Sequence, residues 1–534
     1  MSEAVPDQLV GFDPSGAEPT LGLANAFERA DDIEPIGEVG AIDVDQLPDL
    51  LEPDQELDLR GRTGVRLFLR AVLRWSILGA SVGIVAGCGA SLFIVGLTWI
   101  VSAVDHGRAS LPWWSIAAFP AIGGLVVGYL LWRADRVAFV SACGTDSFID
   151  AVEEADGRIR ARVPLLRILG AWLTIGFGGS SGRECPMIYT GAGLGSTAGQ
   201  VLERVRSRLP RRLARLLDLD AADTRMLALC GAAGALGAVF SAPFGGAVFA
   251  VEVPYRRDVD MDLLVPALVS SSVGYLTGLL LVGRQRLLVV PTVGVLRWPE
   301  WLLVGAIAVA ASLAARGFAG IFNGFHHLVR TRVREDGRFP KWLQTGLGGL
   351  LAGVVMLAFP QVYGIGLDAI RGMASGREFA GHAVAITALL LAALGLAKML
   401  ASTFTVSTGG VGGLLFPSLF AGAAVGGSLA TLAAHQWPGT FPHHAAYVLI
   451  AMSATYAAAG KVPIASLLLL CEACVNFSLA LPMAVANLLA YLLSGRSTVY
   501  DVQRERSEMP HRGYRWAVAL AVLVVLFGRF VVAV

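Results

Sequence analysis

Apolar segments follow one another from about Leu67 to the end of this 534-residue chain, and they restrict its fold more than any other feature. The first covers roughly 71–104, which exceeds the ~20 residues that cross a bilayer upright, so we expect a tilted helix there. Only 16% of the residues are charged, whereas soluble domains average about 25%. The sequence therefore predicts an all-α polytopic membrane protein in the cell membrane. Further apolar segments lie near 113–133, 163–180, 185–202, 225–251, 261–283, 299–325, 342–359, 383–404, 413–434, 445–459, 463–474, 479–493 and 516–534.

The two ends of the chain differ from this pattern. Residues 1–60 contain 16 acidic residues, two basic ones and no long apolar run, so we expect a disordered acidic tail. Residues 506–534 are predicted to form a linker and an extra hydrophobic segment, which Arg529 interrupts. The six cysteines lie in or beside apolar segments, where thiols pack as small apolar groups, and no disulfide framework is expected. No cofactor or metal site is predicted.

An internal repeat is visible in two ordered matches. GRECPMIYTGAGLGS (182–196) aligns with GLLFPSLFAGAAVGGS (413–428), because glycine and proline recur at the same places. APFGGAVFAVE (242–252) aligns with VPIASLLLLCE (462–472), and each has a glutamate nine residues after its proline. Two matches in the same order favour a duplication.

The loops after the first match indicate how the two copies are oriented. The loop at 201–225 is rich in arginine, whereas its counterpart at 432–446 contains neither lysine nor arginine. By the positive-inside rule, the first loop is cytosolic and the second is not. The two halves, about 65–285 and 299–505, are therefore expected to form an inverted-topology repeat of interrupted, tilted helices.

The stretches GSSGRECP and GGVGGLLFP are typical of helices that begin inside the membrane. The N-terminus of such a helix presents unpaired N–H groups and about half a positive charge, so it attracts an anion. Glu184 would compete with the anion for these donors, and its protonation would remove the competition. Glu184 is therefore a candidate gate or proton carrier. The alternative is that Arg183 and Glu184 form only a helix-capping ion pair.

These motifs resemble those of the CLC family of chloride channels and chloride/proton exchangers, over roughly 65–505. GRECP resembles the family's GREGP, GGLLFP its GxFxP, and CGTDS (143–147) its GSGIP. The resemblance implies a homodimer with one anion pathway in each subunit, and Glu184 as the external gate. Many members of the family append a soluble nucleotide-binding CBS module, and we expect none after the membrane part here. The anion-binding residues that it implies are Cys143, Gly144, Arg183, Glu184, Leu414, Leu415, Phe416 and Tyr500.

The sequence departs from the family pattern at several of these positions. Cys143 replaces a serine, and a thiol is a weaker donor than a hydroxyl. Asp146 replaces a proline and would oppose an anion at its helix start. Cys185 replaces a glycine beside the gate; it is either a small packing residue or a redox-sensitive thiol. Leu415 stands in the position of the family's phenylalanine, where the backbone N–H is expected to donate.

The family's paired internal glutamates fall on Glu252 and Val253. The second position passes protons to the cytosol in many exchangers, and here it is apolar. Glu252 could relay protons instead, or it could pair with Arg256 or Arg257 at the end of its helix.

The favoured function is therefore transport of chloride or another small monovalent anion across a bilayer, channel-like or weakly coupled to protons. A fully coupled chloride/proton antiporter is the first alternative. A sodium-coupled organic-anion carrier would need a cage of oxygen ligands, and none stands out. A membrane-embedded enzyme would need a His/Asp or Ser/His arrangement inside the spans, and this alternative is not favoured. No nucleic-acid partner is expected.

Overall fold

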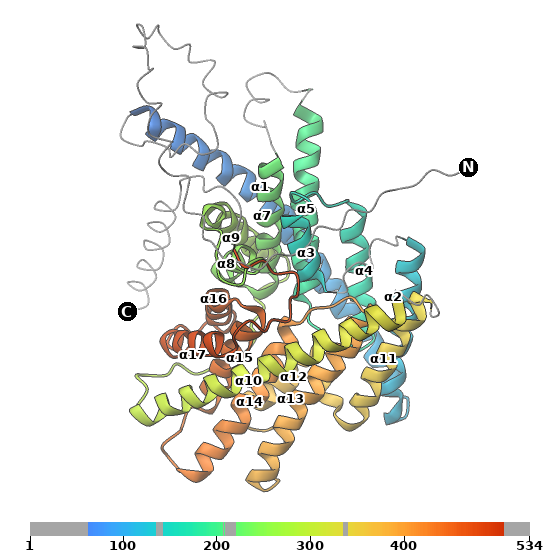
Figure 1. Cartoon of the computed structure of the whole chain (residues 1–534), viewed down its shortest axis with the longest axis vertical. Helices are drawn as coiled ribbons and strands as arrows, with labels where there is room; N and C mark the ends of the chain where they lie inside the picture. Colours follow the sequence, from blue (N-terminus) through green and yellow to red (C-terminus); the bar gives the residue numbers. More distant parts are fainter. Residues whose placement is uncertain (1–61, 135–142, 207, 209–220, 335–339, 507–534) are drawn as a thin grey trace, which may run out of the picture. The chain divides into compact units, whose positions relative to one another are not determined.

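The computed structural model describes residues 62–134, 143–206, 208, 221–334 and 340–506. The predicted acidic tail at 1–60 and the predicted segment at 516–534 lie outside these residues. Sixteen α-helices, and no strands beyond isolated bridges, make up the described part of the chain, so the all-α prediction is confirmed (Figure 1). Seven helical segments among these residues are long and apolar enough to cross a membrane, as expected of a multi-pass membrane protein.

The helices fall into two runs of eight that repeat the same order. The first run is α1 (Arg62–Ala109), α2 (Ala118–Ala134), α3 (Gly144–Glu153), α4 (Arg162–Gly176), α5 (Glu184–Arg206), α7 (Ala221–Phe240), α8 (Pro243–Glu252) and α9 (Leu264–Leu281). The second run is α10 (Trp298–Leu328), α11 (Lys341–Ala358), α12 (Leu367–Ala374), α13 (Val384–Ser407), α14 (Leu415–Gln436), α15 (His444–Gly460), α16 (Pro463–Cys474) and α17 (Ala480–Leu493).

The packing follows the same repeat. α5 packs on α7 as α14 packs on α15, and α7, α8 and α9 pack together as α15, α16 and α17 do. Equivalent helices also meet across the two halves, since α2 packs on α11 and α8 on α16. Gly182 and Gly413, which the sequence alignment equates, form an antiparallel bridge. From that bridge α5 runs upwards and α14 downwards in Figure 1, so the two copies have opposite directions.

One predicted segment is divided in the structure. Residues 225–251 were expected as one apolar segment, but the chain forms α7 and α8 with a break between them. Ser241 at the break has a φ of +52°, in the left-handed region, and Pro243 begins α8. A proline has no N–H to continue the preceding helix but fits the first turn of the next one, so α8 starts anew in the interior.

Close approach of the helices depends on glycine in the first half. A Cβ on Gly191 of α5 would overlap the carbonyl oxygen of Gly231 on α7, and a Cβ on Gly231 would overlap that of Gly191. Contacts between small residues allow two helix backbones to touch, which favours association within a membrane. The glycine excess therefore contributes directly to the packing of α5, the helix that begins at Glu184.

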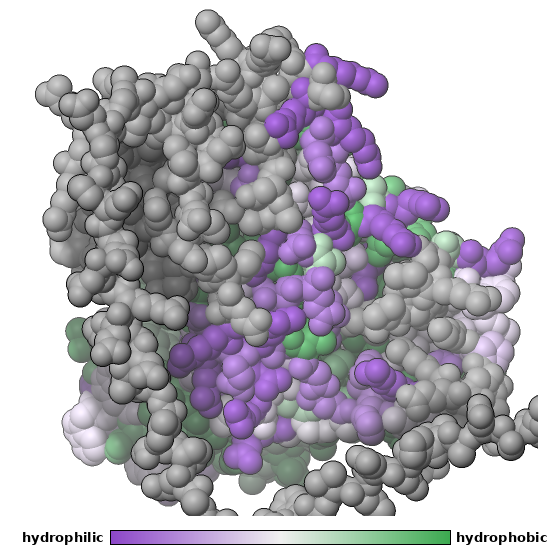
Figure 2. Space-filling view, turned by 45° about the horizontal axis from the view of Figure 1, so that its top comes forward, coloured by the Kyte–Doolittle hydropathy of each residue, from purple (hydrophilic) through white to green (hydrophobic). Residues whose placement is uncertain are grey.

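Polar residues gather at the end of the helical bundle where α3 and α5 finish. Exposed charged residues there include Glu154, Arg158, Arg160 and Arg204. Figure 2 looks onto the upper side of the molecule in Figure 1 and shows hydrophilic side chains gathered across it. Three of these four residues are basic, and Arg204 belongs to the arginine-rich loop that the sequence predicts to be cytosolic.

Candidate functional site

Three helices begin at one place in the interior. Cys143 is the N-cap of α3, Glu184 is the first residue of α5, and Leu414 is the N-cap of α14. The extended backbone before α14 joins them, because Gly412 forms a parallel bridge with Cys143 and Gly413 forms the antiparallel bridge with Gly182. Three N-termini thus bring their unpaired N–H groups together, which creates a site for negative charge.

Glu184 places a carboxylate at this point. Its side chain is buried, with a relative exposure of 1%, and its Oε1 accepts a hydrogen bond of 2.9 Å from the N–H of Leu415. The amide of Phe416 also lies within interaction range of the carboxylate. A carboxylate from the first half of the chain therefore occupies the helix start of the second half, 231 residues away in sequence.

Glycine makes room for the carboxylate. A Cβ on Gly182 or on Gly413 would overlap the carboxylate oxygens of Glu184. The two glycines of the repeat therefore flank the carboxylate from both halves, so any side chain at either position would displace it. Arg183 does not form the capping ion pair with Glu184 that was the alternative interpretation. Its guanidinium lies 5.7 Å from the centre of the Phe416 ring, and its Nη2 donates to the carbonyl of Val239 at 3.4 Å.

Beside Glu184, Cys143 and Thr145 at the start of α3 and Cys185 of α5 contribute two thiols and a hydroxyl. The Sγ atoms of Cys143 and Cys185 are 3.7 Å apart, and Thr145 Oγ1 lies 2.8 Å from Cys185 Sγ. Gly144 touches the backbone of Cys185, since a Cβ on Gly144 would overlap the Cys185 carbonyl oxygen. The first turn of α3 also carries Asp146, as the sequence predicts.

Tyr500, in the segment after α17, is the last of the predicted anion-binding residues. Its side chain is fully buried, and its hydroxyl lies 3.2 Å from that of Tyr456, which stacks on Phe249. Tyr500 is near enough to Cys143 and Cys185 to interact with them electrostatically. The structure therefore brings all the predicted anion-binding positions to one region, where N–H, thiol and phenol groups offer donors to a small anion.

Lys398 is a charged residue of this region that sequence reasoning missed. It is fully buried on α13, and its Nζ donates to the carbonyls of Gly364 (2.7 Å) and Val362 (3.2 Å). It interacts electrostatically with Glu184. A lone lysine inside the apolar run at 383–404 was the available signal, because ionisable residues within spans are usually functional.

Glu252 and Glu472, which the repeat equates, each cap a helix start in the opposite half of the chain. Glu252, at the end of α8, accepts hydrogen bonds from the N–H groups of Ile464 (3.2 Å) and Ala465 (2.6 Å) at the start of α16. Glu472, in the last turn of α16, accepts one of 2.8 Å from the N–H of Gly245 at the start of α8. The two caps are equivalent under the repeat, and both carboxylates are buried.

The predicted pairing of Glu252 with arginine is wrong. Arg256 and Arg257 pair instead with Glu505, at 3.9 Å and 3.5 Å. Glu252 has turned back to helix-start amides because these donors are buried with it, whereas the arginines extend towards solvent. Val253 beside it is fully buried, and its carbonyl accepts a hydrogen bond from Gln503.

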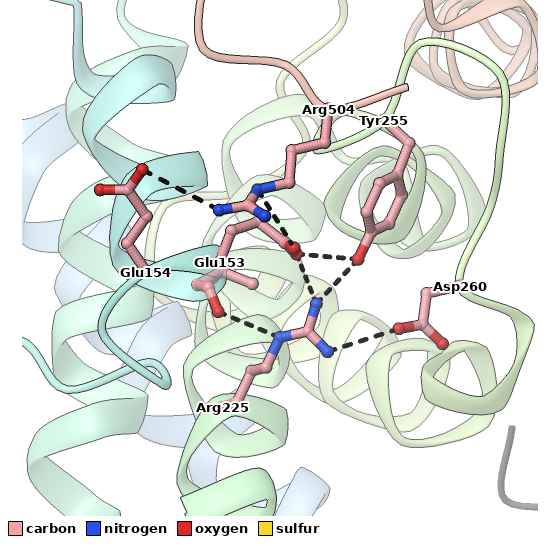
Figure 3. Close-up of polar contacts among 7 residues, drawn as sticks. Glu153, Glu154, Arg225, Tyr255, Asp260 and Arg504 are labelled. Atoms are coloured by element: carbon pink, nitrogen blue, oxygen red, sulfur yellow. Dashed lines mark hydrogen bonds and ion pairs between the residues drawn. The ribbon is translucent and has the colours of Figure 1, made fainter. Parts of the chain in front are cut away.

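A buried ion-pair network links α3 to the segment that carries Tyr500 (Figure 3). Arg225 of α7 contacts Glu153 at 2.5 Å, the hydroxyl of Tyr255 at 2.7 Å and Asp260 at 3.7 Å. Arg504, four residues after Tyr500, lies 3.9 Å from Glu153. The C-terminal segment is thereby linked to the end of α3, the helix that begins next to Cys143.

Comparisons with known proteins agree with this fold. The sequence model of a family described as voltage gated chloride channel matches residues 124–495. A putative chloride channel protein of Ralstonia nicotianae, described as ClcB-like, is 27% identical over an alignment of 429 residues that covers 78% of this chain and 94% of that protein. The voltage-gated ClC-type chloride channel ClcB of Citrobacter koseri is 24% identical over an alignment of 446 residues that covers 82% of this chain and 99% of that protein.

Solved structures share the architecture. A slow cyanobacterial Cl⁻/H⁺ antiporter matches with a TM-score of 0.67 at 18% identity, covering 80% of this chain and 96% of its own. A CLC-type fluoride/proton antiporter matches with a TM-score of 0.64 at 21% identity, covering 81% of this chain and 98% of its own. At such identities the likeness is one of fold.

Proposed function

We propose, from the premise that this chain belongs to the voltage gated chloride channel (CLC) family, that it forms a transmembrane pathway for chloride gated by Glu184. The pathway is channel-like or weakly coupled to protons. The observation that carries the proposal is the hydrogen bond between the Glu184 carboxylate and the N–H of Leu415. An anion that enters from the Glu184 side needs this same donor.

Gating follows from competition for the helix start. The carboxylate and a chloride ion both gain from the Leu415 N–H and from the positive end of α14, and both cannot occupy it together. Protonation neutralises the carboxylate and weakens its hold on the amide. Flux is therefore expected to rise as the pH falls. Lys398 and Arg183 supply positive charge beside the same point and attract the anion.

The inner part of the pathway uses the start of α3 and Tyr500. We assign anion binding there to the amide of Gly144, the thiol of Cys143 and the hydroxyl of Tyr500, together with the amides that follow Leu414. A thiol donates more weakly than the hydroxyl that the family places at position 143, so this inner site holds chloride less tightly.

The apolar side chain of Val253 supports the proposal that transport is at most weakly coupled to protons. A proton that leaves Glu184 for the cytosol needs a titratable group beyond it, and Val253 is apolar and buried. Both oxygens of Glu252 accept hydrogen bonds from the amides of α16, so its carboxylate is engaged as a cap. A coupled exchanger would have to use Glu252 by breaking this cap.

The test is simultaneous recording of chloride and proton movement in vesicles that contain the purified chain. A reversal potential at the chloride equilibrium value, with no proton movement against its gradient, is the expected result. Stoichiometric proton pumping driven by chloride would replace the proposal with full antiport. Uptake that needs sodium and carries no chloride would reject the chloride pathway itself.

We further propose a homodimer with one pathway in each subunit, as in the family to which the chain belongs. We propose that residues 61–505 form the membrane domain, which consists of two inverted halves at about 65–285 and 299–505. Cross-linking in vesicles, followed by mass measurement of the detergent-extracted complex, tests the dimer. A single subunit with full flux would reject it.

A further inference from the structure

Two cysteines lie against each other where α3 and α5 begin. The Sγ atoms of Cys143 and Cys185 are 3.7 Å apart, and the side chains are 2% and 0% exposed. Gly144, the residue after Cys143, touches the Cys185 backbone, because a Cβ on Gly144 would overlap the Cys185 carbonyl oxygen. A disulfide requires a sulfur–sulfur distance of about 2.05 Å and Cα atoms about 4.4–6.8 Å apart. The two sulfur atoms must therefore approach by less than 2 Å for the bond to form.

A hydroxyl and a positive charge lie beside the pair. Thr145 Oγ1 lies 2.8 Å from Cys185 Sγ and can share a proton with it. The buried guanidinium of Arg167 interacts electrostatically with both thiols, and its positive charge offsets part of the cost of forming a thiolate. Cys185 Sγ is also 3.7 Å from Glu184 Oε1, so the pair adjoins the proposed gate, and peroxide would have to reach it along the proposed anion pathway.

We propose that Cys143 and Cys185 form a redox site at which peroxide creates a disulfide that closes the anion pathway. In the first step, one thiolate attacks hydrogen peroxide; an S–O bond forms, the O–O bond breaks, and the departing hydroxide takes up a proton as water. In the second step, the other thiol attacks this sulfenic acid; the S–S bond forms, and a second water leaves. Two thiols are oxidised by two electrons in total, and one peroxide is reduced to two waters.

The disulfide would act on the site in two ways. It removes the S–H of Cys143, which is a donor to the anion, and it links the starts of α3 and α5. The helix starts are then held at disulfide distance, and the passage between Glu184 and Tyr500 narrows. This effect on flux rests on the proposed function, whereas formation of the bond does not.

The bond itself can be tested on the unaltered protein. The chain in detergent is treated with hydrogen peroxide, its remaining thiols are alkylated under denaturing conditions, and it is digested with trypsin. Alkylation should fall from six cysteines to four. A cross-linked pair of peptides, 137–158 with 184–204, should appear and vanish on reduction. Peroxide treatment that leaves both peptides separate overturns the proposal.

The effect on transport is measured as chloride efflux from vesicles. Peroxide should abolish most of the efflux, and dithiothreitol should restore it. Cys143→Ala and Cys185→Ala should each make the efflux insensitive to peroxide. The matched control is Cys471→Ala/Cys474→Ala, which removes two other buried cysteines on α16 and should keep the wild-type response.

Three results would overturn the closing role. The first is a cross-link that forms without any loss of efflux. The second is a peroxide-induced loss of efflux that persists in Cys143→Ala or in Cys185→Ala. The third is a loss of efflux that disappears in the Cys471→Ala/Cys474→Ala control. Absence of chloride efflux in the reduced wild-type protein would instead reject the proposed function, and the peptide cross-link would still be read independently.

Discussion

Replacing Glu184 by glutamine tests whether its carboxylate competes with the anion. The carboxylate accepts the Leu415 N–H at 2.9 Å in a buried site. A hydrogen bond to a charged group contributes about 2 kcal/mol, and the position at a helix start about 1 kcal/mol more. The neutral amide oxygen of glutamine keeps about 1 kcal/mol of this interaction, so the side chain of the variant holds the Leu415 N–H about 2 kcal/mol less tightly against chloride. Chloride should then bind about 30-fold more tightly, because 1.4 kcal/mol corresponds to a factor of ten.

The assay is calorimetric titration of chloride into the purified protein at neutral pH, combined with efflux from vesicles over a range of pH. Wild-type efflux should rise on acidification, and efflux through the Glu184→Gln variant should be high at every pH. Glu472→Gln is the matched control. It makes the same change in another buried glutamate that accepts a helix-start N–H, that of Gly245 at 2.8 Å. This control should keep the wild-type chloride affinity and the wild-type pH response.

Two outcomes would refute the reasoning. If Glu184→Gln bound chloride no more tightly than wild type and kept its pH response, the carboxylate would not occupy an anion site. If Glu472→Gln produced the same changes, the effect would reflect loss of a buried charge in general, since α8 lies outside the group of helix starts at Glu184.

Four further substitutions test the rest of the site. Arg225→Met should lower the free energy of unfolding by about 3 kcal/mol, seen as a lower melting temperature in detergent, because Glu153 loses its closest positive charge. Tyr500→Phe should weaken chloride binding about fivefold in calorimetry, which corresponds to about 1 kcal/mol for one hydroxyl donor; an unchanged affinity would remove Tyr500 from the site. Lys398→Met should weaken chloride binding about tenfold or more, since it removes a buried positive charge beside Glu184; stronger binding would contradict its assigned role. Val253→Glu should increase the number of protons moved per chloride in paired flux recordings, and an unchanged ratio would show that this position does not limit coupling.

Local sequence determined the class of the protein and the place of the site. Apolar segments longer than a bilayer is thick can only be spanning helices, because lipid offers no partner for backbone N–H and C=O groups. Glycine and proline mark where helices begin, since their backbone properties act within a few residues. The repeat and the position of Glu184 at a helix start could thus be predicted from the spacing of glycine and proline, and the opposed halves from the charge of the two loops. The start of α8 was missed because the segment at 225–251 remains apolar across the break at Ser241.

Tertiary structure decided which partners these groups have. Glu184 and Leu415 are 231 residues apart, and nothing local to either indicates that the carboxylate bonds to the other half's helix. The same holds for Glu252 and Glu472, whose exchange of caps replaced the expected arginine pairing, and for the contact between Cys143 and Cys185. Buried polar groups take whichever donor the packing brings within reach, because an unpaired one costs more than any local preference supplies. That choice depends on how two separately encoded halves fit together, so it is made only in the folded chain.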